Sequence, residues 1–472
     1  AQTNFQAFAP KPAITQVANL TINGSAVNVW TLNSPLTVDA TGTFTINTGI
    51  LKVNSTAPGG SLTLNGAGNT VVAGAGLHIA TTLNNTGGLN IGNTAILRME
   101  GTGTPVVTGL SISYTAGGIL QYLLTSASGQ TAGLEFPSTM TGNVVVDITG
   151  ATPTLTLAAP RTMSAASTVQ LANGRIVNTL ANTLTLLNGA PVLSISRTNG
   201  YIDGFLERTI GTAGASYLFP MGQGVDYLGL SFTDAGGTGT VIANAVSGGG
   251  GTPGAGIASL NASGRWQVLT SGGSRMGTVQ LTPSAVLPAN SLVGLATALA
   301  GTYNSIGPAA FGGGASITQI TAQNYTAVPN FLATGGNYTT YYYNNANVFA
   351  GGANNPANWD DTFGVGYGTA ASNFTSVGSI FVVENGATAT LTANLAFGTG
   401  ATPVTLTVPS GATLNTATFA VQFAGDNSIF NLQNGATLAT QNSDGINGSS
   451  ALPNTTGAIQ ITSGTPASVA IN

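Results

Sequence analysis

A short motif recurs at an even spacing near the C-terminus of this sequence. The stretches NGATATLT, SGATLNT and NGATLAT begin at Asn385, Ser410 and Asn434, so the steps are 25 and 24 residues. Each stretch is a turn followed by a run in which apolar and polar residues alternate. A repeat of this length is typical of solenoids and arrays, in which each repeat stacks on the next.

Alternating runs of the same kind occupy most of the remaining sequence. Examples are TFTI from Thr43, SLTL from Ser61, VVVDI from Val144 and TLTL from Thr154. Gly, Asn, Ser or Pro bounds each run, which is the pattern of short strands joined by turns. We therefore predict an all-β chain with short-strand β-solenoid or β-sandwich modules in series.

Changes in composition divide the sequence into four parts. The first part contains Pro10 and Pro12, which exclude a central strand at those positions, so we interpret it as an arm. Residues 19–200 are predicted to form either one solenoid or a sandwich. The predicted parts are an N-terminal arm (1–18), a strand-repeat, β-solenoid-like domain (19–200), a β-sandwich module (201–335) and a second strand-repeat domain (336–472).

Charge is scarce, and this excludes several classes of function. Only 5% of the residues are charged and the net charge is −4, whereas about 25% are charged in an ordinary soluble protein. The nine Lys and Arg residues form no basic patch in the sequence, so nucleic acid is not expected as a partner. Cysteine is absent and no apolar run is long enough for a membrane helix. The composition favours a secreted mature chain at the cell surface.

One segment resembles a module of large secreted surface proteins of the Bacteroidota. The segment is FLERTIGTAGASYLFPMGQGVDYLGLSF, and SGRWQV around Trp266 resembles the next strand of that module. Trp359 matches the tryptophan that opens a further strand-repeat region in those proteins. The positions that match the module are Gly204, Arg208, Gly211, Tyr217, Phe219, Pro220, Gly222, Gly224, Tyr227 and Leu230, with Met221 in place of the usual valine.

The resemblance implies a role in adhesion, surface layers or extracellular fibres rather than one reaction. It also implies export by the type IX system. Those proteins carry a C-terminal sorting domain, which is not recognisable here, so we expect either its removal on export or a different route.

Residues for catalysis are sparse. The only histidine, His78, lies in an alternating run and is predicted to be a half-exposed strand residue. The adjacent Asp360 and Asp361 would point to opposite faces of a strand, which makes them a poor acid and base pair. Glu207, Arg208 and Asp203 lie in the most charged segment of the chain, where we expect a strand-end ion pair that stabilises the domain junction. Charges that a β-helical polysaccharide lyase could use are interpreted as dispersed surface groups: Asp39, Glu100, Glu135, Asp147, Lys52 and Arg98.

We therefore predict a protein that is not an enzyme and needs no metal or cofactor. The main hypothesis is a structural subunit of an extracellular filament, a homopolymer that assembles head-to-tail through β-strand ends. Its N-terminal arm is expected to add a strand to a neighbouring copy through Asn4, Phe5, Phe8 and Ile14. The alternative is a glycan-binding adhesin module of a cell-surface stalk, with sugars stacked on Trp359, Tyr341 and Tyr343.

Overall fold

A computed structural model confirms the predicted all-β fold, a β-solenoid joined to a β-sandwich, with 55% of the residues in strands. Of residues 5–8, 309–311 and 468–471 only the backbone is described. The structure describes residues 5–8, 15–54, 60–125, 129–191, 194–254, 257–287, 291–306, 309–311, 316–336, 340–344, 351–361, 363, 370–371, 373–375, 379–400, 404–425, 428–441, 459–461 and 468–471.

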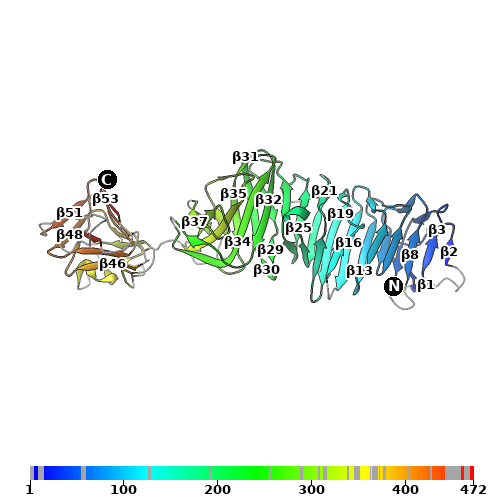
Figure 1. The fold of residues 1–472 in the computed structure, drawn as a ribbon, viewed down its shortest axis with the longest axis horizontal. Helices are drawn as coiled ribbons and strands as arrows, with labels where there is room; N and C mark the ends of the chain where they lie inside the picture. The colour runs from blue at the N-terminus through cyan, green and yellow to red at the C-terminus, as the bar shows by residue number, and fades with distance from the viewer. Residues whose placement is uncertain are drawn as a thin grey trace. The chain divides into compact units, whose positions relative to one another are not determined.

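The chain divides into two compact units. Unit 1 contains Ala1–Thr252 and Asn261–Thr334, and unit 2 contains Pro253–Leu260 and Gly335–Asn472. Unit 1 holds the solenoid and the sandwich, and its strands lie side by side from β1 to β25 in Figure 1.

Each coil of the solenoid in unit 1 contributes one strand to each of three parallel sheets. Sheet A runs the length of the solenoid and has nine strands. In spatial order they are β1 (Phe5–Phe8), β4 (Val29–Leu32), β7 (Ile50–Val53), β10 (Gly76–Ile79), β13 (Ile96–Gly101), β16 (Ile119–Thr125), β19 (Asn143–Thr149), β22 (Val169–Asn173) and β25 (Ile195–Arg197).

On each of the other two faces of the solenoid, one sheet ends after the fifth coil and a new sheet begins. Sheet B contains β2 (Gln16–Val17), β5 (Leu36–Val38), β8 (Ser61–Leu64), β11 (Thr82–Asn85) and β14 (Val106–Gly109), and sheet C contains β3 (Leu20–Ile22), β6 (Phe44–Ile46), β9 (Asn69–Val71), β12 (Leu89–Ile91) and β15 (Ser113–Tyr114). Sheet D then contains β17 (Gln130–Ala132), β20 (Thr154–Leu157), β23 (Arg175–Val177) and β26 (Tyr201–Asp203), and sheet E begins with β18 (Thr139–Met140), β21 (Arg161–Met163), β24 (Leu184–Leu186) and β27 (Leu206–Thr209). A short 3-10 helix, η1 (Leu180–Asn182), precedes β24.

The alternating sequence explains why the coils stack. Leu51, Leu77 and Leu97 are register partners on β7, β10 and β13, and all three are buried in the solenoid interior. Successive side chains of a strand point to opposite faces, so the residues between them point outward. Each buried leucine contributes about 2 kcal/mol of hydrophobic stabilisation. Side-chain hydrogen bonds also join consecutive coils, for example Asn54 to Asn33 at a separation of 21 residues and Asn173 to Asp147 at 26.

The sandwich continues directly from the solenoid. Strand β27 pairs in parallel with β24 on one side and antiparallel with β32 on the other, so sheet E passes from coil to sandwich without a break. The rest of sheet E is β32 (Thr240–Val246), β34 (Ser259–Ser271), β41 (Asn330–Gly336), β36 (Ser291–Ala296), β37 (Thr302–Ser305) and β33 (Thr252–Pro253). The facing strands are β28 (Ser216–Phe219), β31 (Gly229–Gly237), β35 (Arg275–Thr282), β39 (Ile317–Gln319), β38 (Ala309–Phe311) and β40 (Gln323–Tyr325), with a small hairpin of β29 (Gly222–Gln223) and β30 (Asp226–Tyr227).

Unit 2 is a second three-sheet solenoid. Its first sheet contains β43 (Trp359–Asp360), β42 (Thr340–Tyr343), β44 (Ile380–Val383), β47 (Thr405–Val408), β50 (Ile429–Leu432) and β53 (Ser468–Ile471). The other two contain β45 (Thr388–Thr390), β48 (Thr413–Ala417) and β51 (Thr437–Thr440), and β46 (Leu395–Gly400), β49 (Val421–Gly425) and β52 (Ile459–Ile461). Two short 3-10 helices, η2 (Gly352–Asn354) and η3 (Pro356–Asn358), precede β43.

The recurring NGAT-like motif is the turn that enters the second strand of each coil in unit 2. Gly386, Gly411 and Gly435 take φ values of 80°, 79° and 79°, a region that favours glycine. The turns also stack, because the Gly386 amide donates to the Gly411 carbonyl and the Gly411 amide to that of Gly435. The even spacing therefore reflects one turn placed above another.

Candidate assembly surface

The first coil of unit 1 ends in three edge strands. Within the described residues, β1, β2 and β3 each pair with one neighbour only, namely β4, β5 and β6. An edge strand presents unpaired N–H and C=O groups and can act as a template for another chain. Three such edges surround one end of the solenoid.

The hydrogen bonds identify which backbone groups face away from the molecule. The Leu20 amide donates to Thr43, and the Ile22 carbonyl accepts from Asn47. In a parallel pair alternate residues bond to the same neighbour, so the N–H and C=O of the intervening Thr21 point to the open side.

The same reasoning applies to β2. The Thr15 and Val17 carbonyls accept from Thr37 and Asp39 of the next coil. The backbone groups of Gln16 therefore also face the open side.

An apolar pocket lies beside β3, the edge strand of sheet C. It measures about 230 Å³ and is lined by residues of the first three coils. The Trp30 ring is half-buried here and lies against Gly24 and Gly49, where any side chain would overlap the ring. The pocket is lined by Leu20, Thr21, Ile22, Asn23, Trp30, Leu32, Leu36 and Leu51.

The last coil of unit 2 has the same three-sheet form. Strands β51, β52 and β53 are each the final strand of their sheet within the described residues. They pair in parallel with β48, β49 and β50. A three-sheet coil with parallel strands is therefore present at both faces that we consider for assembly.

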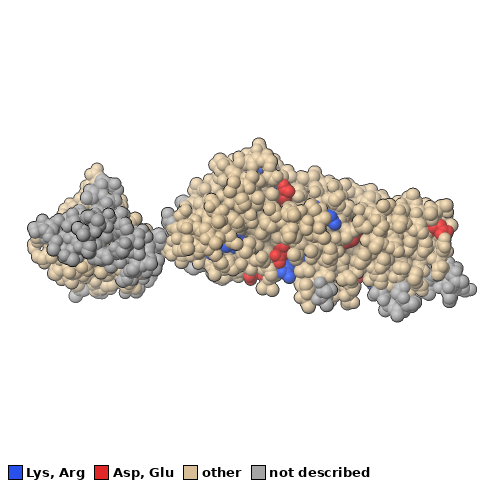
Figure 2. Space-filling model, viewed as in Figure 1, with Lys and Arg blue, Asp and Glu red and all other residues tan. Residues whose placement is uncertain are grey.

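Charge is sparse around these surfaces. Figure 2 shows the Lys, Arg, Asp and Glu side chains of the visible face as a few isolated spots among other residues. Near the first coil, Asp39 accepts a hydrogen bond from the Gln16 side chain, and Asn47 donates to Asn23 at 2.8 Å. Apart from the Asp39 carboxylate, the side chains in these two contacts are neutral amides.

Of the segment that we predicted as a separate arm, the described residues 5–8 and 15–18 belong to the first coil instead. The backbone of Phe5–Phe8 is β1, and it pairs with Val29–Leu32 of the same chain. A strand at this position satisfies its backbone groups on one side, so it does not project as a free arm. Asn4, Ile14 and the side chains of Phe5 and Phe8 lie outside the described residues.

The aromatic residues that we assigned to glycan stacking face the interior of unit 2. Trp359 is fully buried and Tyr343 is 4% exposed, with their ring centroids 5.3 Å apart. Tyr341 is half-buried and stacks on Phe381 at 5.4 Å. Buried rings offer no face to a sugar, so we do not retain these residues as a glycan site.

The charges of the solenoid are less dispersed than we predicted. Glu100 lies on β13, and Lys52 Nζ is 2.6 Å from its Oε1. His78 Nδ1 and Arg98 Nη1 lie 3.2 and 3.9 Å from its Oε2. His78 is buried, not half-exposed as predicted. We call Lys52, His78, Arg98 and Glu100 the outer charge cluster.

Electrostatics keep Glu100 ionised. Burial alone would raise the pKa of this carboxyl, but hydrogen bonds and charge from His78 and Lys52 lower the pKa to about 2. The sequence held a signal for this cluster, because Lys52, His78 and Arg98 are separated by about one coil. We did not use that spacing.

A second carboxyl, Glu135, is buried in the solenoid interior. Burial raises its pKa, although the Gly133 amide donates to Oε1 at 2.8 Å and the Tyr122 hydroxyl at 2.9 Å. The Tyr114 hydroxyl donates to the Glu135 carbonyl at 2.7 Å. These contacts lie at the coils where sheets D and E replace sheets B and C. They occupy the solenoid interior at that point.

The strand-end ion pair that we predicted at the junction does not form between Glu207 and Arg208. Glu207 accepts hydrogen bonds from Thr185 at 3.0 Å and Thr240 at 2.5 Å. Arg208 is fully buried and donates to the Leu218 carbonyl at 2.5 Å, and burial lowers the pKa of its guanidinium to about 10. Neighbouring residues of one strand point to opposite sides, which separates the two charges.

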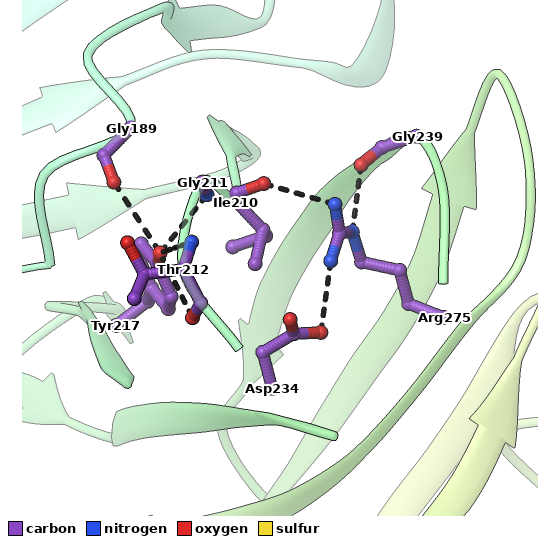
Figure 3. A network of polar contacts seen from close by, with 8 residues as sticks. All are labelled: Gly189, Ile210, Gly211, Thr212, Tyr217, Asp234, Gly239 and Arg275. Atoms are coloured by element: carbon purple, nitrogen blue, oxygen red, sulfur yellow. Dashed lines mark hydrogen bonds and ion pairs between the residues drawn. The ribbon is translucent and has the colours of Figure 1, made fainter. Parts of the chain in front are cut away.

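Other polar groups of this segment, which resembles the module of secreted surface proteins, join the last coil of unit 1 to the sandwich. The Tyr217 hydroxyl accepts from the Gly211 amide at 2.9 Å and the Thr212 amide at 2.8 Å, and donates to the Gly189 carbonyl at 3.3 Å (Figure 3). Asp203 pairs with Arg175 at 2.9 Å. These contacts hold the junction together.

Arg275 forms the second set of hydrogen bonds in this network. It donates to Asp234 Oδ1 at 2.8 Å, to the Ile210 carbonyl at 2.9 Å and to the Gly239 carbonyl at 2.8 Å (Figure 3). Each of the three guanidinium nitrogens therefore donates a hydrogen bond, to a carboxylate or to a carbonyl, which is typical of a buried arginine with a structural role.

Asp360 and Asp361 lie beside the buried aromatic residues of unit 2. Asp360 is 2% exposed and is in β43 with Trp359. In the described part of the chain, no group of three or more His, Asp or Glu side chains is arranged to hold a metal ion. Nor do the described residues include an apolar helix of membrane-spanning length.

Comparisons of the chain with models of known protein families, with curated proteins and with solved structures give no match.

Proposed function

We propose that this protein is a structural subunit of an extracellular filament or surface fibre that grows by end-to-end stacking of solenoid coils. The observation that carries the proposal is the first coil of unit 1, where β1, β2 and β3 are edge strands within the described residues and β3 also lines an apolar pocket. The resemblance to secreted surface proteins and the absence of cysteine support an extracellular location.

The physical argument combines two driving forces. A strand added to β2 or β3 would satisfy the outward N–H and C=O groups of Gln16 and Thr21. Covering the pocket would bury Leu20, Ile22 and Trp30, which line it, at a gain of about 25 cal/mol per Å² of apolar surface.

A second copy of the chain is the partner that suits this surface best. The last coil of unit 2 offers parallel edge strands in three sheets, as the first coil of unit 1 does. The two faces differ from each other, so their contact is heterologous and adds copies in a line unless the rotation closes a ring. Few charged residues occur in the sequence of either coil to keep copies apart.

Proline at the open edge tests this proposal. Gln16→Pro with Thr21→Pro removes two outward donors while the ladder bonds to β5 and β6 stay in place. Negative-stain microscopy and sedimentation across a concentration series should show fibres for the natural sequence and short or no fibres for this variant.

Alanine at the same positions is the matched control. Gln16→Ala with Thr21→Ala changes the same side chains but keeps both N–H groups, so it should form fibres of ordinary length. Circular dichroism and thermal melts must show that both variants fold. Equal fibre mass from a folded proline variant, or monodisperse particles from the natural sequence at every concentration, would refute the proposal.

A further inference from the structure

The outer charge cluster is a row across three strands. Lys52 on β7, His78 on β10 and Arg98 on β13 are direct register partners. The residues on either side of each, such as Leu51 and Leu97, are buried in the interior, so the row points outward. Neighbouring strands are about 4.8 Å apart, which places Lys52 and Arg98 roughly 10 Å apart along the solenoid.

The row has more positive than negative charge. One carboxylate, Glu100, contacts all three members, and its low pKa keeps it ionised. The nearest acid on the same face is Asp147, two strands away, which accepts from Asn173 at 2.8 Å. Lys52, Arg98 and Glu100 together carry a net charge of about +1.

These cations remain accessible, unlike most arginines of the chain. The side chains of Lys52 and Arg98 are 37% and 25% exposed. Arg98 Nε donates to Gln121 at 2.9 Å, and its Nη1 lies 3.9 Å from Glu100 Oε2. The other cations with described side chains bond to backbone carbonyls: Arg161, Arg175, Arg197, Arg208, Arg265 and Arg275.

A half-buried apolar row runs beside the charged one. Ile50, Ile96 and Ile119 are two residues before Lys52, Arg98 and Gln121 on the same strands, so they share the outer face. Gly76 interrupts this row, and His78 Nε2 lies over it, 3.3 Å from where a Cβ would stand. Aliphatic side chains can pack against the C–H faces of sugar rings while the cations bind anionic groups.

We propose that this face of sheet A binds an acidic polysaccharide, along a line that crosses β7, β10 and β13. Lys52 and Arg98 bind its carboxylate or sulfate groups, and the isoleucine row packs against its rings. Glu100 fixes Lys52 and His78 in position and limits the affinity. Nucleic acid suits the face less well, because apart from His78 the two rows contain no aromatic side chain for stacking bases.

Fluorescence anisotropy of a labelled oligogalacturonate tests the proposal with the full chain. Competition with dextran sulfate identifies sulfate as the anion, and neutral dextran should not compete. Lys52→Gln with Arg98→Gln should weaken binding at least about tenfold, because two charge-assisted contacts are lost. Glu100→Gln should strengthen it, because a competing carboxylate is removed.

Arg197→Gln is the matched control. It removes one positive charge from β25, at the far end of sheet A, and should leave the affinity unchanged. Thermal melts confirm that each variant folds. The proposal is overturned by equal binding of the natural chain and the folded double variant, by equal competition from neutral dextran, by stronger competition from single-stranded DNA than from either acidic polymer, or by the absence of binding to both acidic polymers.

Discussion

At the scale of single residues, the charges of this protein are few but unevenly distributed. Glu100 brings together Lys52, His78 and Arg98 on one face of the solenoid. Glu135 is buried among tyrosine hydroxyls instead. The two carboxyls have pKa values shifted in opposite directions, so they should respond oppositely to pH.

Glu100→Gln should destabilise unit 1 at neutral pH by about 1–3 kcal/mol. The folded pKa of Glu100 is lowered from 4.5 to about 2, so its stabilisation is present above pH 4.5 and is lost as the pH falls toward 2. Thermal melts of both proteins from neutral to acidic pH measure the difference. A difference that does not shrink toward pH 2 would show that charge is not its source.

Glu135→Gln should behave in the opposite way. Burial raises the folded pKa of Glu135, so the natural protein loses stability as the pH rises above the unfolded value of 4.5. Gln keeps an oxygen for the Gly133 amide and the Tyr122 hydroxyl. The melting temperature of the variant should therefore rise relative to the natural protein with increasing pH, and a constant gap would contradict the assignment.

Residue positions were the hardest part to predict from sequence. Alternation is enough to place Leu51, Leu77 and Leu97 on one face of their strands, because side-chain direction follows a period of two. It could not show that Lys52, His78 and Arg98 meet, since that depends on the register between coils. Nor could it show that Trp359 and Tyr343 are interior residues, because an aromatic run suits both a core and a sugar-binding surface.

At the scale of elements, the turn of each coil in unit 2 sets the spacing of the repeat. Gly386 and Gly411 have nearly the same positive φ but different surroundings. A Cβ at position 386 would meet open space, whereas one at position 411 would overlap Asn385 Oδ1. Comparing an alanine substitution at Gly386 with one at Gly411 therefore separates the cost of backbone strain from the cost of steric overlap.

Gly386→Ala should cost about 1–2 kcal/mol, the usual penalty for a side chain in the left-handed region. Gly411→Ala should cost more, because the added methyl group also displaces Asn385 and disturbs the stacked turns. Denaturant unfolding of each variant measures the two costs. Equal costs would mean that the turns do not pack as described.

The strands themselves were easier to predict than their connections. The motif spacing and the flanking turns indicated short strands, and the solenoid of unit 1 confirms them. The change from sheets B and C to D and E was not foreseen, because parallel pairing leaves the same alternating pattern in every sheet. The continuity of sheet E from coil to sandwich was hidden for the same reason.

At the scale of the whole molecule, scarce charge and an open first coil lead to the same expectation. The proposed contact consists of backbone hydrogen bonds and apolar side chains such as Trp30. Fibre formation should therefore change little between low and physiological salt, because only charged contacts are strongly screened. Light scattering across a salt series measures this, and loss of assembly on adding salt would indicate an electrostatic contact instead.

Hydrogen–deuterium exchange of the peptide that covers residues 15–22 tests the central claim most directly. In free subunits the amides of Gln16 and Thr21 face the open edge and should exchange rapidly. In sedimented assemblies the same peptide should become protected, while exposed turns such as that at Val225, which is 95% exposed, should not change. Exchange at residues 15–22 that is equally fast in subunits and assemblies would contradict the account.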